Sequence, residues 1–179
     1  MNPASAILSD CRRYRYYLQR SWHETRPRLC FIMLNPSTAD ETHNDATIKS
    51  CMGRGAAMGF GGIDIVNLFA LRSTNPKGLY PLDVLPVSEP GIPWKNDGII
   101  ERVTQAAGTV ICAWGKHGQH LHRDRIVLQR LRALGVSTWA LKLNSDGSPG
   151  HPLYIPYTRK PIPFLHDRSP HERTGTSGA

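Results

Sequence analysis

The chain has 179 residues and a mass of 20.0 kDa, which is long enough for one domain to bury a continuous core without disulfide or metal links. Hydrophobic residues make up 40% and charged residues 20% of it, a balance that excludes fibrous, coiled-coil and largely disordered proteins. The chain has 22 Lys and Arg residues and 14 Asp and Glu residues, so the net charge is +8 and the pI is about 9.6. A surface of this charge attracts polyanions, so we expect nucleic acid or a nucleotide as the partner.

The sequence contains no recognisable segment for export or membrane insertion. Its start lacks an apolar stretch of signal length, and no later run approaches the roughly 20 apolar residues that a membrane span needs. The cysteines at positions 11, 30, 51 and 112 stand far apart and form no C-x-x-C pair, which is typical of free thiols in a reducing compartment. We therefore expect a cytoplasmic protein without a membrane partner. We also expect a monomer that needs no cofactor.

The first half of the chain predicts two strands and a helix. Residues 14–22 alternate aromatic or apolar side chains with basic ones and indicate an edge strand. The uninterrupted apolar run at 29–34 indicates a central strand that is covered on both faces, and it ends at Asn35-Pro36-Ser37. A helix follows, with Asp45 as its N-cap and its end near Gly59.

From residue 63 onward the chain repeats this unit. Buried strands are expected at 63–69, 109–114 and 138–143, and helices from Asn96 or Asp97 to Gly108 and over 123–134. Strands that alternate with helices indicate crossover connections, and hence a three-layer α/β/α fold around a central, mostly parallel sheet of four strands. We assign residues 1–166 to a single domain and 167–179, which lack apolar periodicity, to a disordered C-terminal tail.

Polar loops follow the four predicted central strands. In an open parallel sheet, a ligand lies outside the carboxyl ends of the strands because these loops converge there. The amide-rich loops suit recognition of a planar polar ligand, and neither a Walker-type loop nor a G-x-G-x-x-G motif is present. The candidate site residues are Asn35, Pro36, Ser37, Asp40, Asn44, Asp45, Asn67, Trp114, Lys116, His151 and Pro152.

Several candidates also have a purely structural explanation. Asn35 and Pro36 are ordinary residues for ending a strand, and Asp45 is an ordinary residue for capping a helix. An amide inside an apolar strand, as at Asn67, needs either a backbone partner or a ligand. A histidine cluster near Asp124 fits either a metal site or a basic loop, and its members are His117, His120 and His122.

Between Tyr14 and Phe164 the chain resembles a bacterial and phage protein family that is defined as a domain of unknown function. The resemblance rests on FIMLNPSTADETHNDATIKSC, IVNLFALRSTNPK, AWGKHG and GHPLY. The order of these motifs is more distantly similar to the uracil-DNA glycosylase superfamily, which implies a uracil-DNA-glycosylase-like fold. The scattered cysteines exclude the iron–sulfur branches of that superfamily.

The glycosylase resemblance implies a role for each loop. The Asn35-Pro36-Ser37 loop would position a water molecule, Asn67 would read the edge of the base, and Trp114-Gly115 would end a buried strand. His151-Pro152 would enter the minor groove and support the leaving base. We therefore expect hydrolysis of an N-glycosidic bond in a nucleic acid or nucleotide, with Asn35 and His151 as catalytic residues. The aromatic residues considered for stacking on the base are Phe60, Phe69 and Trp94.

Two other classes of function stay open from the sequence. A nucleic-acid or nucleotide-binding module without turnover is favoured by Met33, which stands where the glycosylase loop has a glycine. A metal-dependent hydrolase would use Asp40, His43 and Asp45 together with the histidine cluster that begins at His117.

Overall fold

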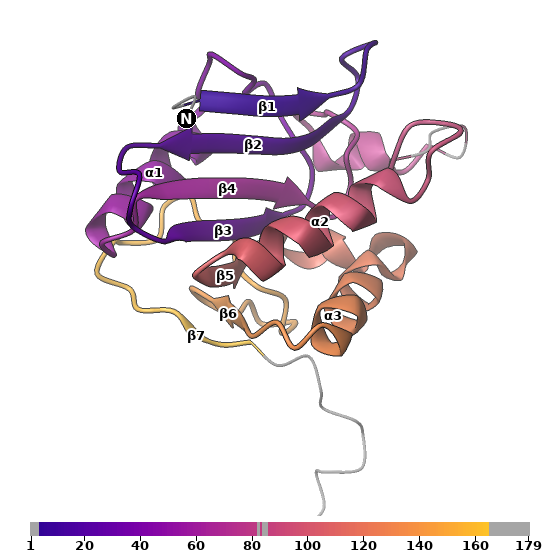
Figure 1. The fold of residues 1–179 in the computed structure, drawn as a ribbon. Helices are drawn as coiled ribbons and strands as arrows, with labels where there is room; N and C mark the ends of the chain where they lie inside the picture. The colour runs from indigo at the N-terminus through magenta and orange to yellow at the C-terminus, as the bar shows by residue number, and fades with distance from the viewer. Residues whose placement is uncertain (1–3, 82, 84–85, 165–179) are drawn as a thin grey trace, which may run out of the picture.

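Residues 4–81, 83 and 86–164 are described by a computed structural model. The strands are β1 (Ala4–Leu8), β2 (Arg15–Ser21), β3 (Arg28–Met33), β4 (Gly62–Asn67), β5 (Thr109–Cys112), β6 (Thr138–Ala140) and β7 (Ile162–Pro163). In this part of the chain they form one seven-stranded sheet with the order β1-β2-β4-β3-β5-β6-β7 (Figure 1). Strands β4, β3, β5 and β6 are parallel, whereas β1, β2 and β7 pair antiparallel with their neighbours.

The predicted number of four strands is wrong, because the sheet extends on both sides of its parallel centre. The sequence does not signal β1 or β7, since each is short and is defined by pairing with a neighbour rather than by an apolar run of its own. Strand β1 pairs along the outer side of β2, so β2 lies inside the sheet. The prediction of an edge strand over residues 14–22 is therefore also wrong.

Helices lie on both faces of the sheet (Figure 1). They are α1 (Ala46–Ala57) on one face, and α2 (Lys95–Ala106) and α3 (Arg123–Ala133) on the other. Side chains alternate along a strand, so Leu29 and Phe31 of β3 pack with α1, while Cys30 and Ile32 pack with α2 and α3. This burial of both faces explains why the central strands are uninterrupted apolar runs in the sequence.

Helix α1 begins and ends as the sequence predicts. The Oδ1 of Asp45 accepts a hydrogen bond from the backbone N–H of Ile48 at 2.9 Å, and Gly59 follows the helix with a φ of 81°. Helix α2, in contrast, begins one residue before Asn96 and has no side-chain cap. The Asn96 amide is buried and donates to the carbonyl oxygen of Asn67 instead.

The apolar runs extend beyond the strands that they predict. Strand β4 ends at Asn67, yet Leu68 and Phe69 stay fully buried and donate backbone hydrogen bonds to the carbonyl oxygens of Met33 and Leu34. An apolar run shows that its residues are buried, but it does not show that they lie in a strand. Where a strand is followed by a buried loop, the sequence therefore predicts a strand that is too long.

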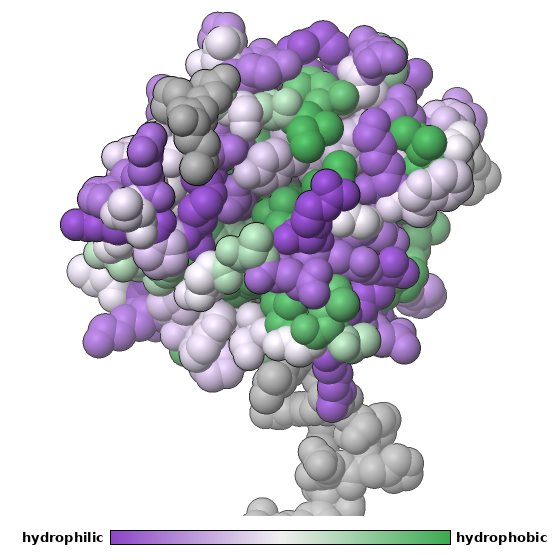
Figure 2. All heavy atoms as spheres, viewed as in Figure 1, coloured by the Kyte–Doolittle hydropathy of each residue, from purple (hydrophilic) through white to green (hydrophobic). Residues whose placement is uncertain are grey.

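Hydrophilic residues cover much of the face that carries α2 and α3, with smaller hydrophobic areas among them (Figure 2). In the described ranges no helix is long and apolar enough to cross a membrane. Of the cysteines, Cys30, Cys51 and Cys112 are buried and Cys11 is exposed. The predicted domain boundary at 166 and the predicted tail at 167–179 lie outside the described residues.

A polar network ties three neighbouring strands together. Asp64 of β4 is 5% exposed and accepts hydrogen bonds from Nε and Nη2 of Arg28 on β3, both at 2.8 Å. The hydroxyl of Tyr17 on β2 donates to the same carboxylate. Burial and this carboxylate raise the pKa of Tyr17, so the hydroxyl keeps its proton and stays a donor. The network thus holds one buried charge between β2, β4 and β3.

We predict that Asp64→Ala lowers the free energy of unfolding by about 2 to 4 kcal/mol, because it leaves the partly buried Arg28 guanidinium without its counter-ion. Urea denaturation measures the change. The matched control is Glu41→Ala, which removes a carboxylate from the exposed pair with Arg12 and should leave the denaturation midpoint nearly unchanged. Equal effects of the two substitutions would contradict the structural role of the network.

Candidate functional site

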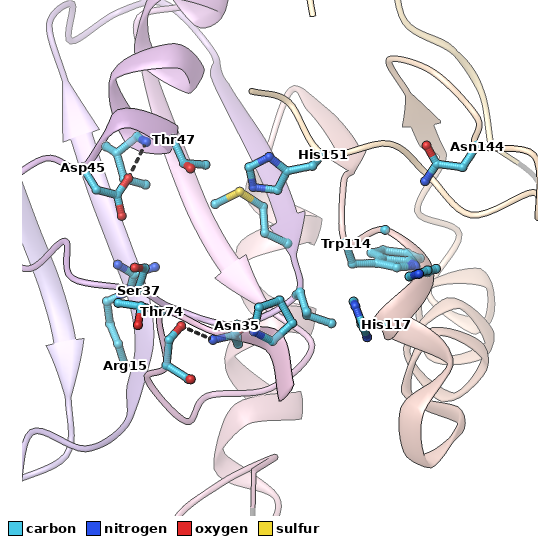
Figure 3. Close-up of a pocket in the computed structure, with 17 residues that line it drawn as sticks. Arg15, Asn35, Ser37, Asp45, Thr47, Thr74, Trp114, His117, Asn144 and His151 are labelled. Carbon is cyan, nitrogen blue, oxygen red and sulfur yellow. Dashed lines mark hydrogen bonds between the residues drawn. The ribbon is translucent and has the colours of Figure 1, made fainter. Parts of the chain in front are cut away.

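A cavity of about 470 Å³ opens at the carboxyl ends of β3 and β5, next to the N-terminus of α1 (Figure 3). Loops converge at this edge of a parallel sheet, and the volume suits a small-molecule ligand. The predicted site residues that line the cavity are Asn35, Ser37, Asp45, Trp114, Lys116 and His151. Segments far apart in the sequence thus meet at one site.

The side chain of Asn35 is held in one orientation through its amide nitrogen. Nδ2 donates to the carbonyl oxygen of Ser73 at 2.7 Å and to that of Pro36 at 3.0 Å. Both amide hydrogens are therefore used, and Oδ1 is the atom left to accept a hydrogen bond. The backbone N–H of Ser73 also donates to the Pro36 carbonyl oxygen at 2.8 Å, which joins the loops that follow β3 and β4.

His151 lines the cavity as a residue that is partly open to solvent. Its Nδ1 accepts a hydrogen bond from the backbone N–H of Leu153 at 3.3 Å, so Nε2 carries the proton of the neutral imidazole. Nearby protein atoms displace water from the ring and lower its pKa, while the Asp45 carboxylate partly opposes this shift. At neutral pH the Nε2–H of His151 is therefore an uncharged hydrogen-bond donor.

The segment after His151 is anchored by a buried arginine of α1. Arg54 is 0% exposed, and its guanidinium donates to the carbonyl oxygens of Ile155 at 2.8 Å, Pro156 at 3.0 Å and Arg159 at 3.2 Å. These bonds attach an otherwise irregular segment to a helix of the core. The position of His151 consequently depends on α1 as well as on the loop that carries it.

Other predicted residues support the loops and do not line the cavity. Asp40 accepts hydrogen bonds from the backbone N–H groups of Thr42 and His43, both at 2.9 Å, and these bonds lower its pKa. The Oδ1 of Asn44 accepts a hydrogen bond from Nε of Arg20 at 2.7 Å. Both residues therefore fix the loop before α1. Two further predicted residues are buried, Pro36 and Pro152.

Asn67, the predicted base-reading residue, is also outside the cavity wall. It is 1% exposed, and its Oδ1 accepts a hydrogen bond from Nη2 of Arg15 at 3.3 Å. Its Nδ2 has no hydrogen-bond partner among the described residues. The structure thus places Arg15, and not Asn67, where it can meet a ligand.

Arg15 is the main feature of the site that no sequence pattern singles out. It is 2% exposed, and its Nη1 donates to the carbonyl oxygen of Ala39 at 2.9 Å. Burial lowers its pKa to about 10, and attraction to Asp45 partly offsets the shift, so Arg15 is charged at neutral pH. In the sequence nothing separates it from the other arginines nearby, which are Arg12, Arg13 and Arg20.

Aromatic and imidazole rings lie at the end of the cavity opposite Arg15 (Figure 3). Trp114 is 3% exposed, and Gly118 leaves room for its ring, since a Cβ at position 118 would clash with Cδ1 of Trp114. The Nδ1 of His117 lies 2.6 Å from the hydroxyl oxygen of Tyr80. The aromatic candidates for stacking on a base do not line the cavity, and these are Phe60, Phe69 and Trp94.

The residues expected to ligate a metal do not come together in the described part of the chain. Within residues 4–81, 83 and 86–164, no three His, Cys, Asp or Glu side chains lie close enough together to hold a metal ion. Asp45 caps α1, and Nε2 of His120 lies 3.0 Å from the carbonyl oxygen of Leu79. These residues are engaged in local structure, which favours the structural explanation of the histidine cluster.

The chain belongs to the family described as "Protein of unknown function (DUF1643)", whose model matches residues 15–153. This match confirms the family resemblance that the motifs predict. No curated protein and no solved structure matches the chain. The likeness to the uracil-DNA glycosylase superfamily therefore stays a prediction.

We predict that His151 titrates below the ordinary histidine pKa of 6.5, because partial desolvation disfavours the imidazolium. Asp45→Asn should lower the pKa further, since it removes a carboxylate that favours the charged ring. NMR titration of the ring Cε1–H resonance measures both values. Asp10→Asn, which removes an exposed carboxylate outside the cavity wall, is the control and should leave the pKa of His151 unchanged. A value at or above 6.5 in the unsubstituted protein would refute the prediction.

Proposed function

We propose that the protein hydrolyses an N-glycosidic bond of a nucleotide or nucleic acid, in the cavity that Asn35 and His151 share. One observation carries this proposal. Two oriented groups of opposite hydrogen-bonding character, the Oδ1 acceptor of Asn35 and the Nε2–H donor of His151, come to one cavity from separate loops. Hydrolysis of this bond needs one group for the water and one for the base.

Asn35 suits the role of positioning water. As the glycosidic bond breaks, the sugar gains oxocarbenium character, so the attacking water needs orientation more than it needs a strong base. The Oδ1 of Asn35 would accept a hydrogen bond from the water, whose oxygen lone pair attacks the sugar carbon as the C–N bond breaks. The proton that the water then loses neutralises the departed base anion. The bonds from Nδ2 to Ser73 and Pro36 support this role, because they keep the amide from turning its nitrogen toward the water.

His151 suits the role of stabilising the departing base. The base gains negative charge as it leaves, and the Nε2–H of His151 would donate a hydrogen bond to it. A neutral donor attracts the charged transition state more strongly than the neutral substrate, and that difference is what accelerates a reaction. Loss of one such donor typically costs about a hundredfold or more in rate.

The order of motifs along the chain also supports the proposal. In the uracil-DNA glycosylase superfamily, which this order resembles, the corresponding loops position water and support the base. The departure from that pattern concerns the reading of the base, because the Oδ1 of Asn67 is occupied by Arg15. Asn67 is therefore not free to read the base, and of the two residues Arg15 is the one that lines the cavity.

A binding module without turnover is the second candidate, and Met33 favours it. Met33 lines the cavity and is 5% exposed, at the position where the glycosylase loop has a glycine. A thioether side chain takes up space that a glycine leaves to the sugar or base. The two candidates differ in one measurable outcome, which is release of the free base.

We predict that Asn35→Ala and His151→Ala each lower the rate of base release by about tenfold to a hundredfold or more, while ligand affinity stays nearly unchanged. Both side chains would act mainly in the transition state. Chromatography of the free base detects turnover, first in a screen of nucleotides, nucleosides and base-modified oligonucleotides. The rate of base release by each variant is then measured on the substrate that the screen finds.

The controls replace an amide and a histidine outside the cavity wall. Gln129→Ala and His23→Ala change exposed residues and should keep the full rate. Full activity of both the Asn35 and the His151 variants would refute the mechanism. Tight ligand binding with no base release from any member of the panel would instead favour the binding module.

A further inference from the structure

One wall of the cavity holds a buried cation that makes no ion pair with the described residues. Arg15 is 2% exposed, and among the described residues its N–H groups make two hydrogen bonds, from Nη1 to Ala39 and from Nη2 to Asn67. Its Nε has no partner in the described part of the chain. A guanidinium has five N–H donors, and a buried charge without compensation is costly. A ligand that brings negative oxygen atoms to Arg15 would remove this cost.

The groups beside Arg15 are hydrogen-bond donors. The cavity wall includes the hydroxyl groups of Ser37, Thr47 and Thr74, of which Ser37 and Thr74 lie beside Arg15 in Figure 3. Helix α1, with 12 residues, also begins here, so the positive end of its dipole faces the same space. Guanidinium groups, hydroxyls and helix N-termini are the groups with which proteins bind phosphate oxygens.

The charge balance of the cavity is positive. Asp45 is the one acidic side chain among the lining residues, and its Oδ1 already accepts the backbone N–H of Ile48. Against it stand the positive charges of Arg15 and Lys116. Asp45 weakens the attraction for an anion without cancelling it, and its removal therefore offers a test.

We infer that the Arg15 end of the cavity binds the phosphate group of a nucleoside monophosphate. The nucleoside part of this inference rests on the proposed function. With the phosphate at Arg15, the sugar would lie near Asn35 and the base near Trp114 and His151, which is the order of these residues across Figure 3. A terminal phosphate suits a site at a buried guanidinium because no nucleic-acid chain continues beyond it. The substrate is then a free nucleotide.

Calorimetric titration of the full chain tests the phosphate subsite. The probes are the common nucleoside 5′-monophosphates, the matched nucleosides and inorganic phosphate, all at low salt. At least one monophosphate should bind about tenfold or more tightly than its nucleoside, and inorganic phosphate should compete with it. Equal affinity of every monophosphate and its nucleoside would overturn the inference.

Substitution of Arg15 locates the subsite. Arg15→Gln should weaken monophosphate binding by about tenfold to a hundredfold and leave nucleoside binding nearly unchanged. Arg125→Ala removes the same charge from an exposed position on α3 outside the cavity wall, and should bind as the unsubstituted protein does. A folded Arg15→Gln variant with undiminished monophosphate affinity would overturn the inference.

Asp45→Asn gives a second test that does not depend on the folding of the Arg15 variant. Asn caps helices about as well as Asp, so α1 should stay intact while the negative charge is lost. Monophosphate binding should then tighten by about threefold or more. Weaker binding would overturn the inference, because it would mean that Asp45 accepts a hydrogen bond from the ligand near Arg15.

The binding experiments test the phosphate subsite and the turnover experiments test the proposed function, so either claim can be contradicted without the other. Phosphate-dependent binding without base release would contradict the proposed function and support the phosphate subsite. Base release from oligonucleotides alone, with no preference for monophosphates, would support the proposed function and overturn the phosphate inference.

Discussion

The parallel pairing of β3 with β4 and β5 is the constraint on which the site depends. It sets Met33 beside Asn67 and Ile32 beside Cys112, so the three strands end at one edge of the sheet. Both faces of these strands are buried under helices, which leaves the strand ends as the place where polar groups gather. For this reason Asn35 and Trp114 share a cavity although they are far apart in the chain.

Part of the positive charge of the chain is turned inward. Four arginines of the described residues are at most 4% exposed and donate to carbonyl oxygens, and these are Arg15, Arg20, Arg54 and Arg123. Many of these carbonyls belong to loops, where no regular sheet or helix supplies a donor, and one guanidinium reaches several of them. The net charge of +8 consequently overstates the positive charge that a polyanion meets at the surface. This distribution of charge agrees better with a cavity that presents one of these arginines to a small anion than with a basic surface that binds a polyanion.

The sequence predicted the position of polar groups better than their partners. Asn35 follows the end of a buried strand and lines the cavity, and Asp45 both caps α1 and lines it. Asn67 ends a buried strand in the same way, yet its oxygen is bonded to Arg15. A pattern of apolar residues shows where a strand ends. It does not show which side chain from a distant segment forms a hydrogen bond with the polar residue at that end.

Apolar runs, caps and motifs are properties of neighbouring residues, and the four central strands, the start of α1 at Asp45 and the family of the chain follow from them. The extension of the sheet by β1 and β7 and the burial of Arg15 depend instead on contacts between distant segments. A short strand forms only where a free sheet edge accepts it, and Arg15 meets Asn67 from 52 positions away. Such contacts join segments that are far apart in the chain and that meet only when the core packs. Local sequence patterns therefore cannot predict them.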